Sequence, residues 1–524
     1  MKVRQICMMV LLGLGVIPAM QAQTFDKLWK EVEQAEKKSL PKTVIKLTDE
    51  IYQKGEKERN SAQMLKAYMW RMKTQDILTP DSFYVGLRDL EQWAKQTEQP
   101  MDRAILHSLI AEFYANYAAD NQWQLRQRTE IVGETPSADI REWTANMFVE
   151  KVRTNVKEAL ADSLLLLKTS SLNYIPFVEL GETSEYYHHD MYHLLASRAI
   201  RALNQIERLE RGSFNGITAS PVKQDIINIY ERMTDAYETA GLKEGYVLTM
   251  LQYLEWKRGN DNKLQPVQLK KGLGEWTADT YNAASDELKR QFKSEPICAE
   301  VYLAQVRYAV EKMQQVNALQ LCDEAIRLYP GYRRINALKN LREEILAPFL
   351  NVSAVSQAFP NEEIKLNVGH KNLDGFTVRL YQAKKLVKEQ HYSVLRPKDY
   401  RAKDTVFTFK APDLGTYVMR IIPDIRAKRD SESKFNVTRF KVLTCRLPEN
   451  QYEVVTLDGQ TGHPIPNAKV TLYSSDEKVL QEFTTDKEGK VVFLRNTKYR
   501  YLKASKGTDT AMPKQGIYGG SYGY

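Results

Sequence analysis

Residues 341–368 read LREEILAPFLNVSAVSQAFPNEEIKLNV, and they contain the transition that decides the fold. Before Leu346-Ala347-Pro348 the apolar residues recur at helical spacing, whereas from Asn351 onward they alternate with polar residues. Ile364 and Leu366, for example, fall on the same face of an extended strand. The sequence therefore predicts a multidomain chain in which an α-helical region precedes a β region.

The helical region is predicted to cover residues 23–348. Amphipathic spacing recurs along it, as in Ile105 to Tyr117 and Met191 to Ile206. All seven tryptophans, from Trp29 to Trp276, lie in this region. Aromatic residues at helical spacing are expected to form core rather than a ligand site.

One helical hairpin near the end of this region has a recognisable spacing. A tetratricopeptide unit is a pair of antiparallel helices of about 34 residues. Its pattern is matched by Tyr302, Val306, Ala318, Cys322, Ala325 and Pro330. The segment 318–330, ALQLCDEAIRLYP, resembles the second helix of such a unit. Although the intervals between the earlier hairpins are irregular, we predict a tetratricopeptide-like solenoid.

Two immunoglobulin-like β-sandwiches are expected after the helices. Residues 349–447 hold enough short alternating strands for one sandwich of about 100 residues. Residues 448–524 form a second module, in which the sequence predicts strands at Tyr452–Leu457, Ala468–Tyr473, Val479–Thr484 and Lys490–Leu494. Because this module is shorter than an ordinary sandwich, we expect it to be incomplete, lacking a strand or two.

The first 22 residues are predicted to be a signal peptide. Lys2 and Arg4 precede the apolar run Ile6 to Ile17, which is too short to span a bilayer comfortably, and Ala22 precedes a plausible cleavage site. The alternatives are an uncleaved anchor or a buried N-terminal helix. We expect export to the periplasm or the outer cell surface.

Charge and cysteine content exclude some classes of protein. The formal charge is +9, and removing Lys2 and Arg4 leaves 9 − 2 = +7, spread along the chain. Nucleic acid is therefore not an expected partner. Beyond the signal the cysteines are Cys298, Cys322 and Cys445, too few for a disulfide framework. Cys298 and Cys322 either pair across a helical hairpin or remain buried thiols.

Two short motifs match catalytic patterns only by letter. His189-Asp190-Met191-Tyr192-His193 has the histidine spacing of a zinc-protease helix, but Asp190 stands where the glutamate base belongs, and a third ligand at a recognised spacing is missing. We interpret it as a helix start, with Asp190 in the first turn. Gly519 to Gly523 matches a serine-hydrolase turn without its strand and helix context. We predict no enzyme activity, no cofactor, and no catalytic, cofactor-binding or metal-binding residues.

Three segments resemble a known family. They are Trp29 to Glu36 continuing to Lys42, His370-Lys371-Asn372 continuing to Tyr381, and Asp458 to Ala468 together with Thr485 to Lys490. They are similar to bacterial alpha-2-macroglobulin-like proteins, especially the large forms from Bacteroidetes-type bacteria, in which a helical region precedes macroglobulin-like sandwiches. The last segment is also similar to carboxypeptidase-regulatory-like sandwiches.

The resemblance implies an exported protease inhibitor. In this family a protease cuts a bait segment and is then caged, and many members bind it covalently through a Cys-x-Glu-Gln thioester. Here Cys298-Ala299-Glu300 is followed by Val301, and we identify neither a bait segment nor a downstream array of sandwiches. We therefore expect the N-terminal part of such an inhibitor, which depends on a C-terminal portion or a partner chain.

Two other functions are weighed against this one. An exported interaction scaffold would bind proteins on its helical array and use the sandwiches as spacers. A metal-dependent hydrolase would rest on the histidine cluster alone. The target protease, the oligomeric state and any membrane association do not follow from the sequence.

Overall fold

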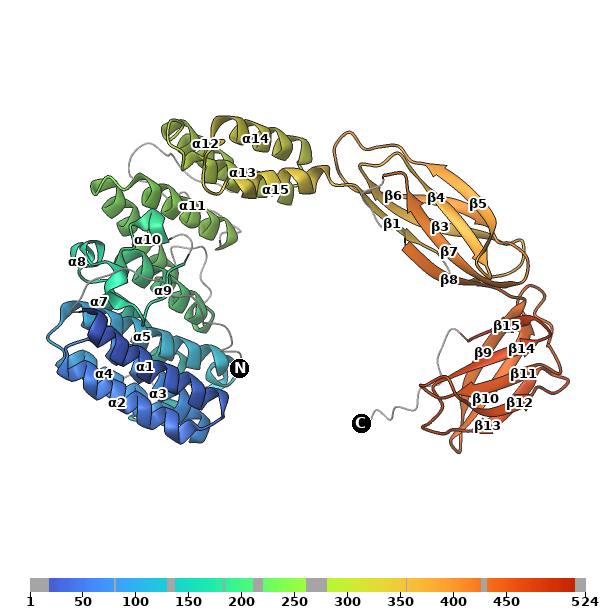
Figure 1. Cartoon of the computed structure of the whole chain (residues 1–524), viewed down its shortest axis with the longest axis horizontal. Helices are drawn as coiled ribbons and strands as arrows, with labels where there is room; N and C mark the ends of the chain where they lie inside the picture. Colours follow the sequence, from blue (N-terminus) through green and yellow to red (C-terminus); the bar gives the residue numbers. More distant parts are fainter. Residues whose placement is uncertain are drawn as a thin grey trace. The chain divides into compact units, whose positions relative to one another are not determined.

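The computed structural model describes residues 18–79, 82–129, 137–181, 184–210, 220–260, 280–354, 356–425 and 431–513. It confirms the predicted fold class, since a long series of helices is followed by several β-sheets (Figure 1). The chain divides into two compact units, Met1–Ala304 and Gln305–Tyr524. Most of the expected signal peptide, residues 1–17, lies outside the described residues, and helix α1 begins at Pro18.

The first unit consists of helices. They are α1 (Pro18–Lys37), α2 (Pro41–Lys57), α3 (Ser61–Leu78), α4 (Ser82–Gln96), α5 (Pro100–Asp120), α6 (Gln122–Gln127), α7 (Ala145–Ala159), α8 (Ser163–Lys168), α9 (Met191–Ile206), α10 (Pro221–Thr239), α11 (Lys243–Asn260) and α12 (Thr280–Gln291). Short 3-10 turns lie between them, among them η2 (Ser171–Tyr174) and η3 (Ser184–Tyr187). Helix α13 (Cys298–Glu311) contains the division between the two units.

Local sequence signals explain where these helices begin. Pro41, Pro100 and Pro221 each occupy the first turn of a helix, where the missing N–H costs nothing. The side chains of Asn60 and Ser220 accept hydrogen bonds from the backbone of the first turns of α3 and α10. Such caps satisfy backbone donors that the helix itself cannot.

The aromatic residues of the first unit mainly form core, as expected. The Trp143 and Tyr114 rings stack with centroids 5.3 Å apart, and both side chains are buried. Trp29 is buried and donates its indole N–H to the Gln63 side chain at 2.7 Å. Trp123 departs from the expectation, because 75% of it is exposed. Trp276 lies outside the described residues.

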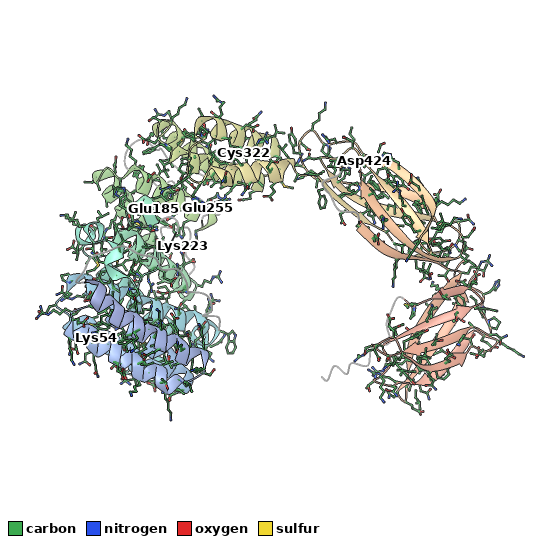
Figure 2. The ribbon with its side chains drawn as sticks, in the orientation of Figure 1. Lys54, Glu185, Lys223, Glu255, Cys322 and Asp424 are labelled. Carbon is green, nitrogen blue, oxygen red and sulfur yellow. The ribbon has the colours of Figure 1, made fainter. Side chains whose placement is uncertain are left out.

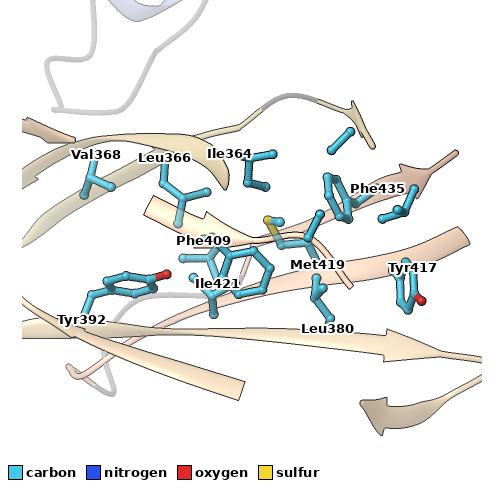
Figure 3. Packing of buried hydrophobic residues seen from close by; sticks show 14 of the residues in the cluster. Ile364, Leu366, Val368, Leu380, Tyr392, Phe409, Tyr417, Met419, Ile421 and Phe435 are labelled. Carbon is cyan, nitrogen blue, oxygen red and sulfur yellow. The ribbon is translucent and has the colours of Figure 1, made fainter. Parts of the chain in front are cut away.

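The second unit begins with helices and continues into a first β-sandwich. Helices α14 (Gln315–Leu328) and α15 (Ile335–Leu346) precede strands β1 (Phe349–Ser353), β2 (Gln357–Ala358), β3 (Glu363–Lys371), β4 (Gly375–Gln382), β5 (Lys385–Ser393), β6 (Lys403–Lys410), β7 (Gly415–Pro423) and β8 (Ser431–Val437). They form a sheet of order β1-β3-β6 and another of order β2-β8-β7-β4-β5. The alternating residues face inward, so that Ile364, Leu366 and Phe409 are almost completely buried between the sheets (Figure 3).

The second sandwich has more strands than the sequence predicted. Its strands are β9 (Phe440–Leu447), β10 (Gln451–Asp458), β11 (Lys469–Tyr473), β12 (Val479–Thr484), β13 (Lys490–Leu494), β14 (Tyr501–Lys506) and β15 (Asp509–Ala511). They form sheets of order β13-β10-β9 and β12-β11-β14-β15 around a core that includes Val454, Val470 and Leu502. Strand β9 pairs with β10, so residues 440–447 lie in this sandwich, although the sequence placed them in the first.

The last helix is tied to the first sandwich. Asn372, at the turn between β3 and β4, donates from Nδ2 to the backbone oxygens of Ile345 at 2.9 Å and Ala347 at 3.4 Å. Lys371 Nζ donates to the Glu344 oxygen at 3.0 Å. The last carbonyls of a helix have no partner within it, so these contacts complete the end of α15. Helix α15 belongs to the same compact unit as the sandwiches.

Among the residues that the structure describes, no helix is both long enough and apolar enough to cross a bilayer.

Candidate functional site

The two histidines of the near-zincin motif do not share a helix face. Helix α9 starts at Met191, and His189 precedes it with a left-handed φ of 56°. The His189 ring lies 3.2 Å from the Ser184 hydroxyl, with its Nδ1 as the contacting atom. His193 is in the helix and stacks on Tyr187 at a ring-centroid distance of 3.6 Å. A zinc site of the i, i+4 type needs both rings on one helical face, and this arrangement does not provide it.

Asp190 has the role that the sequence assigned to it. Its Oδ1 accepts a hydrogen bond from the His193 backbone N–H at 2.7 Å, which makes it the N-cap of α9. Its Oδ2 also accepts from the Tyr237 hydroxyl at 3.2 Å. The carboxylate is buried. Burial raises the pKa of Asp190 to about 6, although the hydrogen bonds from His193 and Tyr237 oppose this rise.

The pKa of His193 is shifted in the opposite direction. Burial lowers its pKa to about 4, so the ring is neutral near pH 7. Its Nδ1 has no hydrogen-bond partner among the described residues. Between about pH 4 and 6, Asp190 and His193 have opposite effects on how the stability of the fold changes with pH. The raised pKa of Asp190 stabilises the fold at low pH, an effect lost as the pH rises through 6, whereas the lowered pKa of His193 destabilises it at low pH.

These groups connect a loop to the start of helix α9. Asp190 and His189 close a loop onto α9, since the His189 carbonyl accepts from the Ser171 backbone N–H at 2.7 Å, and Met191 N–H donates to the Thr169 carbonyl at 3.0 Å. Within the described ranges no three histidine, cysteine or acidic side chains lie close enough to hold a metal ion. The serine-hydrolase match at 519–523 lies outside the described residues.

The cysteines are thiols. No disulfide joins Cys298, Cys322 or Cys445 in the part of the chain that the structure describes. Cys298, at the start of α13, is completely buried, and its Sγ lies 3.7 Å from the Lys289 carbonyl oxygen. Burial raises the pKa of Cys322, on α14 (Figure 2), to about 11. Cys445 alone among these three is exposed.

A buried carboxylate that was not predicted from the sequence joins three segments of the first unit. Asp102, in the first turn of α5, accepts from the Ser61 hydroxyl at 2.5 Å and from the Tyr174 hydroxyl at 2.9 Å. Asp102 and Tyr174 are both buried. An aspartate in a helical first turn is normally exposed, so the pairing across 72 positions of sequence could not be foreseen.

Of the three segments that carry the family resemblance, the first lies in α1 and α2, and the other two lie in the sandwiches. In the first sandwich, residues 370–381 run from the end of β3 into β4, which lie in different sheets, and include the Asn372 contact to α15. Residues 458–468 connect β10 to β11, and residues 485–490 connect β12 to β13. In the second of these turns Gly489 has a φ of 70°, and an added Cβ would lie 2.4 Å from the Thr456 carbonyl oxygen, so only glycine fits.

Comparison with known proteins gives weak matches. No protein-family model matches the chain, and no curated protein matches it. One solved structure with similarity is native alpha-2-macroglobulin from Escherichia coli spanning domains MG0-NIE-MG1, at 17% identity and a TM-score of 0.27, covering 32% of this chain and 63% of that one. Another, spanning domains NIE-MG1, has 14% identity and a TM-score of 0.26, covering 32% of this chain and 96% of that one. These TM-scores are too low to establish a shared fold.

Proposed function

We propose that this chain is the N-terminal part of an exported, non-catalytic alpha-2-macroglobulin-like protease inhibitor. The observation that carries the proposal is that the segments resembling the family occur in a chain whose helical region precedes its sandwiches, which is the order of domains expected for that family. The segments that resemble the family lie in the first two helices and in two successive sandwiches, and these sandwiches follow the helical region.

The chain by itself is not expected to capture a protease covalently. A thioester needs a glutamine carbonyl beside an accessible cysteine. After Cys298-Ala299-Glu300 the chain has Val301, which is completely buried in α13, as is Cys298. Any inhibitory role therefore depends on a further portion or a partner chain.

An exported interaction scaffold is the second candidate. The observation that favours it is the exposure of large apolar side chains in the helical unit: Trp123 is 75% exposed, Ile77 71% and Leu164 66%. Exposed aromatic and aliphatic side chains are common at protein interfaces. In that case the partners would be proteins other than proteases.

The experiment is to recover the natural product from its host with an antibody against the second sandwich. The inhibitor proposal predicts a product larger than the 60.5 kDa of this chain that co-purifies with added trypsin. Co-purification of other proteins, with trypsin absent, would support the scaffold and contradict the inhibitor.

A further inference from the structure

In the part of the second unit that the structure describes, one sheet has apolar side chains on both of its faces. In the sheet β13-β10-β9, Phe493 and Val454 face the core, while Val492, Leu494 and Leu443 face outward. The exposed fractions of these outward side chains are 44%, 67% and 44%. The strand register places Leu494 and Leu447 on either side of Gln451, and Val492 and Cys445 on either side of Glu453. We call this surface the β13 face.

One sheet of the first sandwich carries paired charges on its surface. Across the sheet β2-β8-β7-β4-β5, Arg379 pairs with Glu389 and Arg420 pairs with Glu432. Such cross-strand ion pairs are ordinary for a solvated sheet surface. Large apolar side chains are also exposed on the first sandwich, among them Leu395 at 85% and Val406 at 57%, so exposure alone does not single out the β13 face.

The edge of this sheet is also open. Strand β13 pairs with β10 alone among the described strands. Arg495 N–H donates to the Asn450 carbonyl at 2.8 Å, and Thr456 N–H donates to the Gly489 carbonyl at 2.8 Å. Hydrogen-bonded pairs alternate with non-bonded pairs along an antiparallel ladder. The N–H and C=O groups of Val492 and Leu494 therefore point away from β10.

Two other edge strands, β12 and β5, carry features that discourage pairing, whereas β1 and β6 pair with β3 without a register shift. Strand β12 pairs with β11 through a register shift at Leu472/Tyr473, and Lys469 forms an ion pair with Glu482 at 2.7 Å. Strand β5 pairs with β4 through a shift at Leu380/Tyr381. Bulges and charges of this kind protect sheet edges from adding strands. The ladder between β13 and β10 runs without such a shift, and β13 reads Lys-Val-Val-Phe-Leu.

The charged side chains of the β13 face indicate what kind of partner it can bind. Lys441 and Lys490 lie on the β13 face, and its carboxylate, Glu453, is already 3.9 Å from Lys490 Nζ. The face thus has a surplus of positive charge. We propose that the open edge of β13 and its apolar outer face bind an extended polypeptide segment with alternating apolar residues and acidic ends, which adds as a further strand.

This mode of binding uses two separate features of the surface. Backbone groups of Val492 and Leu494 hydrogen-bond the added strand, and alternate side chains of the segment extend the apolar surface. The proposal does not depend on the protein being a protease inhibitor, because it rests on the edge and the face alone.

The test uses a fluorescein-labelled peptide, Glu-Val-Thr-Val-Thr-Val-Glu, and the whole mature chain. Fluorescence anisotropy should saturate below about 1 mM peptide. Val492→Pro removes a backbone N–H that points to the open edge, and Val492→Lys places a charge there. Each should weaken binding by about tenfold or more. Val406→Lys is the matched control, since Val406 is an exposed valine on strand β6 of the first sandwich, and it should bind as the wild type does.

Several results would overturn the proposal. These are a failure to saturate, equal binding by all variants, or equal binding of a peptide with lysines at both ends. Self-association that is lost in Val492→Lys, without peptide binding, would show that a second copy occupies the face. If Val492→Pro does not retain the circular dichroism of the wild type, Val492→Lys decides the outcome.

Discussion

Asn372 is predicted to hold the last helix against the first sandwich, and its substitution should loosen that junction. Its side chain is buried, its φ is 54°, and its amide donates to the Ile345 carbonyl. In Asn372→Ala the donor is lost and a buried carbonyl remains unsatisfied, at a cost of about 1–3 kcal/mol. Alanine in a left-handed conformation costs roughly 1 kcal/mol more.

A comparison with glycine separates these two effects. Asn372→Gly also loses the amide but tolerates the positive φ, so it should cost about 2 kcal/mol, near the middle of the range for the lost donor. A change of that size alters the opening equilibrium of the junction roughly 30-fold. Asn372→Asp keeps the shape and the tolerance for positive φ, but a carboxylate cannot donate. It should therefore be at least as harmful as the glycine variant.

Limited proteolysis provides the assay. When closing is faster than cleavage, the cleavage rate follows the population of the open form. Cleavage between Ile345 and Asn351 should therefore be slowest in the wild type, faster in Asn372→Gly and fastest in Asn372→Ala. Lys398→Ala, at an exposed position elsewhere in the first sandwich, is the control and should be cut at the wild-type rate. If the glycine variant is cut no faster than the wild type, the contact does not hold the junction and the reasoning is wrong.

Three further predictions concern other parts of the chain. Asp102→Ala leaves the buried hydroxyl of Tyr174 without its acceptor, so the melting temperature of the helical unit should fall by about 4–8 °C in a thermal scan; an unchanged value would contradict the role of this carboxylate. In urea titrations between about pH 4 and 6, the free energy of unfolding of the wild type should change little with pH, because the two pKa shifts oppose each other. It should fall with rising pH in His193→Phe, where the Asp190 shift remains, and rise in Asp190→Asn, where the His193 shift remains. Parallel curves for the three proteins would refute the opposing pKa shifts. A thiol reagent should modify only Cys445 in the native mature protein and all three cysteines in urea, and rapid modification of the two buried thiols in the native state would disprove their burial.

Much of the fold could be predicted because hydrophobic periodicity is a local property. The change from helical to alternating spacing near Pro348 placed the end of α15 and the start of β1 within a few residues. The cap at Asp190 was also a local signal, since an aspartate before an apolar helical run is typical of a helix start. The histidine geometry follows from that cap, because His189 lies before the first helical residue.

What could not be predicted depends on pairing over long distances. Strand β9 has the same alternation as its neighbours, and only its register with β10 assigns it to the second sandwich. Strand β15, which completes the other sheet, is only 3 residues long and gives no periodic signal. The β13 face was missed because alternating apolar residues are expected to face a core, and Val492 and Leu494 belong to a strand that is apolar on both sides.

The most direct test of the proposed function compares inhibition of protease activity on large and small substrates. Trypsin is incubated with the natural product recovered from the host, then assayed on azocasein and on a small chromogenic amide. The proposal predicts that cleavage of azocasein is blocked while cleavage of the amide continues, because a caged protease is hidden only from large substrates. It also predicts that residues 23–524 alone block neither reaction. If the natural product leaves both reactions unchanged, or blocks both equally, the chain is not part of an inhibitor of this kind.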